Sequence, residues 1–317
     1  MRYHQLGRTG LAVSALGFGA ATLGDEYGTL DPAQGQRAVD AAIDAGMNLF
    51  DVSPYYGRTL AEERLGRWLE GKRDRVVLCT KVGRYDRDPP AGFDFSPRRV
   101  RRSVEESLTR LRTDVLDVFL AHDIEFAPLE QILGETLPAM RRLKDEGKVR
   151  FIGVSGFPLE VLRDAVEGAD LDVVLSYCHY DLLNTRLATV LAPAVAARSV
   201  GLISASPLHM GVLTSGGPPP WHPAPPEVLE AGRRAAAWCR ERGLELAEIA
   251  LRFAAANPHA ASTLVGVRTP AEVEVNLRAL EPDPHPEVTA EVRALLAAVR
   301  DREWPSGLWN PLMDGAA

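Results

Sequence analysis

The sequence alternates between short β-branched or apolar runs and longer segments with helical hydrophobic spacing, and this pattern occurs eight times. Such alternation is typical of a parallel sheet covered by helices. Eight units predict an α/β fold in which the sheet closes into a (β/α)8 TIM barrel. The expected strands are Leu16–Gly19, Met47–Asp51, Val76–Lys81, Val115–Ala121, Val149–Ser155, Val173–Tyr177, Gly201–Ser204 and Thr263–Val267. The expected helices are Ala33–Ala45, Ala61–Glu70, Pro97–Leu111, Leu129–Glu146, Leu159–Glu167, Leu187–Arg198, Glu227–Arg242 and Pro270–Leu280.

Capping residues define several helix boundaries. Asp31, Ser96 and Thr269 each precede a proline, a combination that favours a side-chain cap followed by a first-turn proline. Glycines at 46, 147 and 243 follow predicted helices, where a left-handed residue commonly ends the last turn.

Four segments lie outside the repeating unit. The first residues predict a small hairpin around Arg8–Gly10 that plugs one end of the barrel. The proline-rich stretch Leu213–Pro226 predicts a long loop, because proline removes backbone donors. Leu246–Ala256 and Thr289–Arg300 predict additional C-terminal helices. The whole chain, residues 1–317, is expected to form a single domain, as barrels of this length commonly do.

The composition restricts the kind of partner. A net charge of −7 argues against nucleic acid, whose phosphates are bound through clustered lysine and arginine. The polar N-terminus and the lack of a long apolar run predict a cytoplasmic protein with no membrane segment. Cys79, Cys178 and Cys239 lack paired spacing and are expected to be buried thiols. A small molecule is the expected partner, and the sequence leaves the oligomeric state open.

Three other functional patterns are incomplete. Residues 17–22, GFGAAT, lack the third glycine of a dinucleotide-binding turn. Residues 153–157, GVSGF, have Phe157 where a hydrolase nucleophile elbow requires glycine. His122-Asp123 and the 179–181 segment HYD provide no convincing third ligand, so no metal site is expected.

Chemically active side chains fall at the predicted strand ends. Asp51 ends the second strand, Lys81 ends the third, and His122 follows the fourth. Active sites of such barrels are built at the carboxyl ends of the strands, so these residues should meet. Tyr56 lies in the adjoining loop, and Tyr55 is the alternative tyrosine.

The four residue types suit an acid/base role. A tyrosine has a pKa near 10 and needs a neighbouring cation to act as a base. Lys81 is expected to provide that cation, Asp51 to hold it, and His122 to donate to the reacting oxygen. Tyr56 would take a hydroxyl proton as hydride leaves the same carbon, and would return it in the reverse reaction.

The sequence resembles the aldo-keto reductases over essentially its full length. The matching segments are FDVSPYYG at 50–57, CTKVG at 79–83, LAHDIE at 120–125, FIGVSGF at 151–157, SPLHMG at 206–211 and VGVRTP at 265–270. The resemblance implies that Asp51, Tyr56, Lys81 and His122 form the catalytic tetrad, with Tyr56 rather than Tyr55 as the acid/base.

The segments GFDFSP, AHDIEF and SYCHYD and the proline–tryptophan loop resemble the aldose 1-dehydrogenases within that family. This resemblance implies oxidation of C1 of L-galactose, L-fucose or D-arabinose to the lactone. Tyr55, His209 and Trp221 are then the expected sugar contacts. An NADPH-dependent aldehyde or ketone reductase is the alternative, and a nicotinamide-binding regulatory subunit is a less favoured one.

The resemblance also implies a nicotinamide cofactor. The residues implied in its binding are Ser155, Gly156, Tyr177, Ser206, Leu208, Gly211, Gly266, Arg268, Glu272 and Asn276. Gly156 stands where the family usually has asparagine, Tyr177 where glutamine is common, and Ala205 where many members have tyrosine. Gly266 and Glu272 align with basic residues of NADPH-dependent members, and a carboxylate there would repel a 2′-phosphate. NAD is therefore the predicted cofactor and NADP the alternative, since Arg268 could pair with a phosphate.

Overall fold

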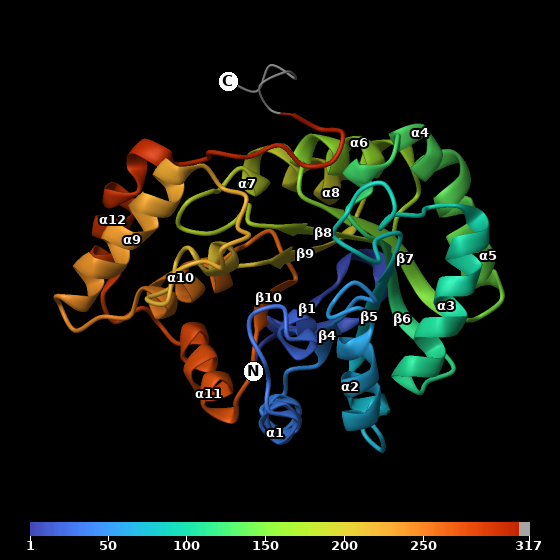
Figure 1. Cartoon of the computed structure of the whole chain (residues 1–317), viewed down its shortest axis with the longest axis horizontal. Helices are drawn as coiled ribbons and strands as arrows, with labels where there is room; N and C mark the ends of the chain where they lie inside the picture. Colours follow the sequence, from blue (N-terminus) through green and yellow to red (C-terminus); the bar gives the residue numbers. More distant parts are fainter. Residues whose placement is uncertain (311–317) are drawn as a thin grey trace.

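The computed structural model describes residues 1–310, and within them eight parallel strands close into a barrel (Figure 1). Around the barrel the strand order is β10-β3-β4-β5-β6-β7-β8-β9, and pairing of Thr263 with Leu16 closes it. The strands are β3 Leu16–Gly19, β4 Leu49–Asp51, β5 Val77–Val82, β6 Leu116–Ala121, β7 Val149–Gly156, β8 Val173–Tyr177, β9 Gly201–Ala205 and β10 Ser262–Gly266. The predicted barrel is confirmed. The single-domain assignment stays a prediction, and its residues 311–317 lie outside the described residues.

A hairpin of β1, Tyr3–Gln5, and antiparallel β2, Ala12–Ser14, covers the amino-terminal end of the barrel. Leu6, Leu11 and Val13 join the same buried cluster as side chains from inside the barrel. Arg8 donates its backbone N–H to the carbonyl of Ser199 at 2.8 Å. The predicted hairpin is therefore confirmed, and it closes the end opposite the carboxyl ends of the strands.

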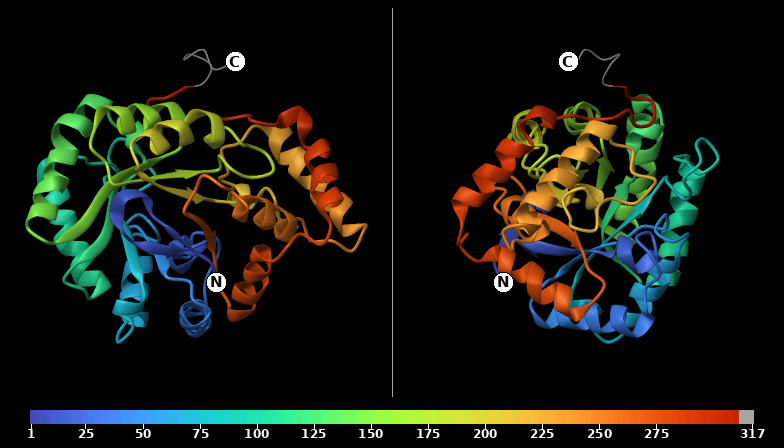
Figure 2. Two further views of the ribbon diagram at one scale, coloured as in Figure 1. Left: turned by 180° about the vertical axis from the view of Figure 1, so that it is seen from behind. Right: turned by 60° about the vertical axis from the view of Figure 1, so that its left-hand side comes forward.

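Helices surround the barrel, and α9 and α12 pack together on one flank (Figure 2). The predicted caps are confirmed: Asp31, Ser96 and Thr269 each accept a backbone N–H of the helix that follows. Glycines 46, 147 and 243 have the predicted positive φ angles of 88°, 75° and 68°. The helices are α1 Pro32–Asp44, α2 Leu60–Trp68, α3 Pro97–Leu111, α4 Leu129–Gln131, α5 Leu137–Asp145, α6 Leu159–Gly168, α7 Leu187–Val190, α8 Ala192–Ala197, α9 Pro226–Arg240, α10 Leu246–Ala255, α11 Pro270–Leu277 and α12 Pro286–Leu295.

Prolines disturb the regular hydrogen bonding within two of the predicted helices. The predicted helix 129–146 contains a π-helical turn, Ile132–Thr136, because Pro138 has no N–H to continue the regular ladder. Pro193 also lacks an N–H, and the predicted helix 187–198 is divided into α7 and α8. Pro226 and Pro286 lie in the first turns of α9 and α12, where a missing N–H is harmless.

The second strand is shorter than predicted and begins at Leu49. Met47 donates its N–H to the carbonyl of Ala42 and so completes the end of α1. The Asn48 side chain accepts the backbone N–H of Ser14 at 2.7 Å and ties the strand to the hairpin. Residues 47 and 48 therefore anchor the chain before the strand starts.

Gly66 provides a test of helix packing in this barrel. A Cβ atom at this position would lie 2.2 Å from the carbonyl oxygen of Arg110 and 2.7 Å from Cα of Leu111. We expect Gly66→Ala to lower the free energy of unfolding by about 1–3 kcal/mol or more, because backbone atoms must move apart. Gly134→Ala is the control, since its Cβ would meet nothing within 4 Å. Urea denaturation measures both, and equal stability of the two variants would contradict the packing argument.

Candidate active site

The four predicted catalytic side chains lie at one rim of the barrel. Asp51 is the last residue of β4, and Lys81 lies near the end of β5. His122 follows β6 directly and donates its backbone N–H to the carbonyl of Val82 at 2.7 Å. Tyr56 lies in the turn between β4 and α2 and returns over the same rim.

Lys81 is the centre of this group. Its ammonium nitrogen lies 2.6 Å from Asp51 Oδ1, 2.9 Å from the carbonyl of Val52 and 3.3 Å from the hydroxyl of Tyr56. The side chain is 1% exposed, so these three acceptors replace water around the charge. An ammonium has three N–H donors, so one donor is directed at the phenol oxygen.

Burial and charge act in opposite directions on these groups. Burial lowers the pKa of Lys81, but the negative charge of Asp51 and the contact with Tyr56 raise it above its ordinary value. Burial raises the pKa of Tyr56 to about 12, although Lys81 opposes this shift. Lys81 is therefore charged and Tyr56 protonated at neutral pH.

The environment of His122 determines its protonation. Burial lowers the pKa of His122 to about 3, so the ring is neutral at neutral pH. Nδ1 lies 3.0 Å from Ser53 Oγ. The same Ser53 oxygen accepts the backbone N–H of Tyr55 at 3.1 Å. Among the described contacts, Nδ1 is the acceptor available to the Ser53 hydroxyl proton. We therefore assign the ring proton to Nε2, which leaves that nitrogen as a donor.

A different cationic side chain lies next to each of the two neighbouring tyrosines. Lys81 lies next to the hydroxyl of Tyr56, whereas the guanidinium of Arg84 lies 3.9 Å from the ring centre of Tyr55. The rings of both tyrosines meet His122 edge-on, at 6.1 Å for Tyr55 and 5.9 Å for Tyr56. The geometry associates the buried lysine with Tyr56, and Tyr55 becomes part of the wall.

A cavity of about 410 Å³ opens above this group, and the tetrad, Tyr55 and Trp221 line it. Trp221 is 40% exposed and comes from the proline-rich loop. Its ring lies 5.8 Å from that of Tyr27 and 5.4 Å from the guanidinium of Arg87. Arg87 in turn pairs with Glu26 at 2.6 Å. These contacts bring three separate loops together at the cavity entrance.

The residues implied in cofactor binding divide into groups. Ser155, Tyr177 and Ser206 line the main cavity. Leu208 and Asn276 line a smaller cavity of about 60 Å³. Gly156 lies beside Glu125, Gly211 has a φ of 102°, and exposed Gly266 ends β10. The structure thus brings residues from β7, β8 and the loop after β9 to one rim.

Arg268 and Glu272 already have partners within the protein. The Arg268 guanidinium donates to the carbonyls of Tyr27, Gly28 and Thr29, the last at 2.7 Å. The Glu272 carboxylate accepts the backbone N–H of Arg268 at 2.6 Å. The charge of Arg268 is thus directed toward the loop at 27–29.

The structure adds cavity-lining residues that the sequence reasoning missed. Arg84, Asp123 and Trp304 line the cavity, and Ser53 supports His122 from behind. Asp123 and Arg84 are joined by an ion pair of 2.5 Å. The sequence could have pointed to Asp123, because it directly follows His122. Nothing in the sequence connects Trp304 with His122, which lies far earlier in the chain.

Glu125 holds the C-terminal segment against this rim. Its Oε1 accepts from the Ser306 hydroxyl at 2.8 Å and from the backbone N–H of Phe157 at 3.2 Å. The carbonyl of Glu125 accepts the N–H of Leu308 at 2.8 Å. Trp304 stacks on Phe157 with ring centres 4.3 Å apart. In Figure 1 this segment crosses the top of the molecule after α12.

His209 does not line the cavity in this structure. The side chain is 1% exposed, and its Nδ1 lies 2.8 Å from Asp181 Oδ2. Its ring meets Trp304 edge-on at 5.5 Å. His209 therefore contacts the back of a wall residue, and a direct sugar contact would require it to move.

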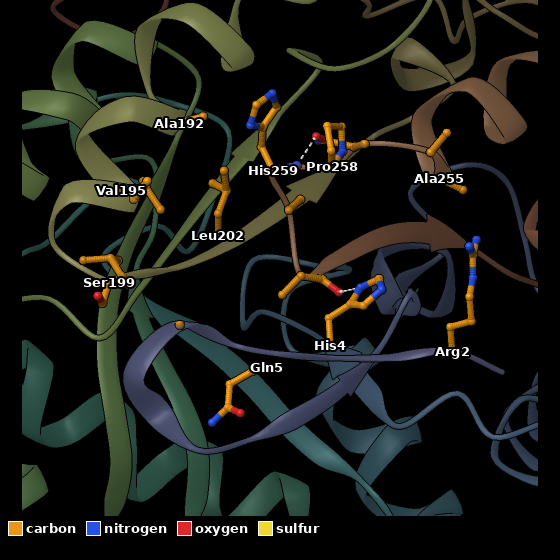
Figure 3. Close-up of a pocket in the computed structure, with 17 residues that line it drawn as sticks. Arg2, His4, Gln5, Ala192, Val195, Ser199, Leu202, Ala255, Pro258 and His259 are labelled. Carbon is orange, nitrogen blue, oxygen red and sulfur yellow. Dashed lines mark hydrogen bonds between the residues drawn. The ribbon is translucent and has the colours of Figure 1, made fainter.

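A second cavity, of about 730 Å³, lies at the opposite end of the barrel, between β1 and the segments that precede β9 and β10 (Figure 3). His4 Nδ1 lies 3.0 Å from the carbonyl of Ala261 there. The tetrad belongs to the other rim.

The three cysteines are buried and free, as expected. Within residues 1–310 no cluster of potential metal ligands is found, and no helix has the length and hydrophobicity to span a membrane.

Comparison with known proteins identifies the family. A model of the aldo/keto reductase family matches residues 15–297. The chain belongs to this family. It is 44% identical to L-galactose dehydrogenase of Arabidopsis thaliana over 96% of this chain and 97% of that protein. It is 32% identical to D-threo-aldose 1-dehydrogenase of a Pseudomonas species, over 96% and 94%.

A solved structure agrees with the fold. The holo form of an aldo-keto reductase from Bacillus halodurans superposes with a TM-score of 0.77 at 26% identity, covering 98% of this chain and 100% of that one. The chain is thus an NAD(P)-dependent oxidoreductase of the aldo/keto reductase family.

The buried Glu125 predicts a pH-dependent stability. Burial and the charge of Asp123 raise the pKa of Glu125 from 4.5 to about 8. Between these values the unfolded chain loses this proton while the folded protein keeps it, so wild-type stability falls as the pH rises. Because glutamine does not titrate, we expect the stability of Glu125→Gln relative to wild type to rise by up to about 1.4 kcal/mol per pH unit.

Urea unfolding at pH 5 and pH 8 measures this difference. Glu130→Gln, at an exposed position in α4, controls for the loss of one carboxyl group. A stability difference between Glu125→Gln and wild type that does not change with pH would show that Glu125 is ionised in the folded protein.

Proposed function

We propose that this chain is an aldose 1-dehydrogenase that oxidises C1 of a cyclic sugar, such as L-galactose, L-fucose or D-arabinose, to the lactone. The observation that carries the proposal is the contact of 3.3 Å between the Lys81 ammonium and the Tyr56 hydroxyl on the wall of the cavity. Two relatives that match over nearly their whole length are named for oxidation of a sugar. Both support a sugar as the substrate.

Tyr56 is the proposed acid/base. In oxidation the Tyr56 phenol first releases its own proton to solvent, and the resulting phenolate oxygen accepts the proton of the anomeric hydroxyl. The electron pair of that O–H bond then forms the C1=O bond. Burial disfavours a phenolate, and the Lys81 ammonium opposes this effect. Asp51 holds that ammonium at 2.6 Å and raises its pKa, so the cation persists through the reaction.

His122 is proposed to orient the reacting oxygen. The neutral ring can donate from Nε2 to the anomeric oxygen while Tyr56 exchanges the proton. Ser53 keeps the ring in this tautomer through its contact with Nδ1. Two separate groups thus position one oxygen, which leaves C1 and its hydrogen free to face the cofactor.

The residues present fit a nicotinamide dinucleotide. Ser155 and Ser206 provide hydroxyl groups on the cavity wall, and Tyr177 provides an aromatic face. Leu208 and Asn276 would hold the far end at the smaller cavity. Bound NAD supplies the acceptor for the two electrons and hydrogen that leave C1, so sugar and NAD become lactone, NADH and one proton.

The proposal is tested by NADH formation with L-galactose, L-fucose and D-arabinose, using wild type and Tyr56→Phe. We expect wild type to turn over at least one sugar and Tyr56→Phe to lower kcat by about 10²–10⁴-fold, because the proton acceptor is lost. Tyr180→Phe is the control, since the Tyr180 ring stacks on Phe253 outside the cavity. Quenching of tryptophan fluorescence by NAD checks that the variants still bind cofactor.

Other outcomes would support the alternatives. Turnover of simple aldehydes with NADPH, and of no sugar, would favour an aldehyde or ketone reductase. Fluorescence quenching by cofactor without any turnover in wild type would favour a nicotinamide-binding regulatory subunit. Unchanged turnover in Tyr56→Phe would rule out the proposed acid/base.

We further propose that NAD is preferred over NADP. Arg268, the cation nearest to Glu272 in sequence, donates to three loop carbonyls and is used within the protein. Glu272 is exposed and negatively charged in the first turn of α11. A 2′-phosphate near this carboxylate would be repelled.

Charge reversal in α11 tests the cofactor preference. We expect wild type to have the higher kcat/KM with NAD. We expect Glu272→Arg to raise the ratio of kcat/KM for NADP to that for NAD by about tenfold or more, since one interaction of 1.4 kcal/mol changes a ratio tenfold. Glu274→Arg makes the same charge change at an exposed position on the same helix and should leave the ratio unchanged. A wild-type preference for NADP would contradict the proposal.

A further inference from the structure

The ion pair of Arg84 and Asp123 has unused hydrogen-bonding capacity at the cavity wall. Both residues line the cavity that contains Tyr56 and His122. Asp123 is 1% exposed, and its Oδ2 pairs with Arg84 at 2.5 Å. Its Oδ1 and the Nε of Arg84 are buried without a hydrogen-bond partner among the described residues. Buried polar groups are rarely left unpaired, so these atoms require an explanation.

Stability alone does not explain the pair. A buried ion pair contributes little more than apolar residues of the same size, and often less, because both charges lose their hydration. Here the guanidinium carbon of Arg84 lies over the Tyr55 ring, 3.9 Å from the ring centre. Asp123 adopts a left-handed backbone with φ of 53°. The charged groups of Arg84 and Asp123, with the His122 ring, thus meet on one wall.

The distance between Asp123 and His122 determines which sugar atoms the Arg84–Asp123 ion pair can contact. Asp123 Oδ2 lies 3.7 Å from His122 Nε2, the nitrogen proposed above to donate to the reacting oxygen. Oxygens on adjacent carbons of a sugar are separated by about the length of a hydrogen bond. An oxygen on the carbon next to C1 is therefore within reach of Asp123 when the C1 oxygen is bound to His122. When a carboxylate and a guanidinium lie side by side, the carboxylate can accept from a hydroxyl group and the guanidinium can donate to the same group.

We propose that Asp123 and Arg84 form the recognition site for the C2 hydroxyl of the sugar. This inference rests on the aldose 1-dehydrogenase activity proposed above. The hydroxyl donates to the Asp123 carboxylate and accepts from the Arg84 guanidinium, so one group satisfies both members of the pair. The ligand class is a sugar with a free hydroxyl next to the anomeric carbon. Simple aldehydes and 2-deoxy sugars leave both charges without this partner.

The charge state of Asp123 supports this role. Burial alone would raise its pKa, but the positive charge of the Arg84 guanidinium and its hydrogen bond to the carboxylate lower the pKa below its ordinary value. Asp123 is therefore ionised and can act as an acceptor at neutral pH. Asp123 also raises the pKa of the nearby Glu125, which stays protonated, so a single negative charge faces Arg84.

The test compares the kcat/KM of two sugars in wild type and in one variant. D-Arabinose and 2-deoxy-D-erythro-pentose differ by the C2 oxygen alone, and kcat/KM is measured for each with wild type and with Asp123→Asn. We expect wild type to prefer D-arabinose by about 10²-fold, because a site built for a hydroxyl discriminates strongly against its absence. In Asp123→Asn the preference should fall to about fivefold or less. The intrinsic reactivity of the two sugars cancels between the enzymes.

A second variant and a control make the result independent of folding. Arg84→Met removes the donor, keeps a long side chain over Tyr55, and should lower the same preference if Asp123→Asn does not fold. Arg87→Met removes a cation from the entrance of the same cavity and should keep the preference for D-arabinose. Thermal unfolding and fluorescence quenching by NAD verify the fold and cofactor binding of each variant.

The outcomes separate the two proposals. If Asp123 acted only through His122, its substitution would slow both sugars equally, and the unchanged preference would overturn the recognition site. A wild-type enzyme that oxidises both sugars at equal kcat/KM would also overturn it, while leaving the aldose 1-dehydrogenase activity intact. A wild-type enzyme that oxidises no sugar but reduces aldehydes would overturn both proposals.

Discussion

The candidate active site depends on one buried cation. The Lys81 ammonium is removed from water and surrounded by the carboxylate of Asp51, the carbonyl of Val52 and the phenol of Tyr56. A buried ammonium without such partners would lose its proton, because desolvation disfavours the charged form. The positions of β4, β5 and the turn after β4 are therefore constrained, because all three acceptors must lie within hydrogen-bonding distance of one nitrogen atom.

Paired charges extend from this centre along the cavity. Asp51 balances Lys81, Asp123 balances Arg84, and Glu125 stays protonated because the charge of Asp123 raises its pKa. A wall whose charges are already paired is better matched to a neutral polyhydroxyl compound than to a strongly charged ligand. The carboxyl group of Glu125 also holds Ser306, so the segment after α12 is attached to this rim.

The barrel and the meeting of Asp51, Lys81 and His122 at one rim could be predicted because both follow from local patterns. Strand ends are visible as the last residues of apolar runs, and parallel strands bring those ends to one rim. Asp51, Lys81 and His122 were located in this way. The choice between Tyr55 and Tyr56 could not follow from spacing alone, since adjacent residues in a turn are distinguished by where their rings point. The prolines at 138 and 193 were visible in the sequence, yet the π turn and the broken helix depend on how the surrounding turns adjust.

Local sequence patterns are enough to specify the strand–helix alternation, the helix caps and the polar residues at the strand ends, because hydrophobic periodicity and capping act over a few residues. The tertiary structure alone decided which cation faces which tyrosine, that His209 lies behind Trp304, and that Arg84 meets Asp123 at the cavity wall. These contacts join residues from different loops, and Trp304 reaches the rim only because the chain returns across the barrel after α12. Such long-range contacts depend on closure of the whole barrel, which no short segment of sequence encodes.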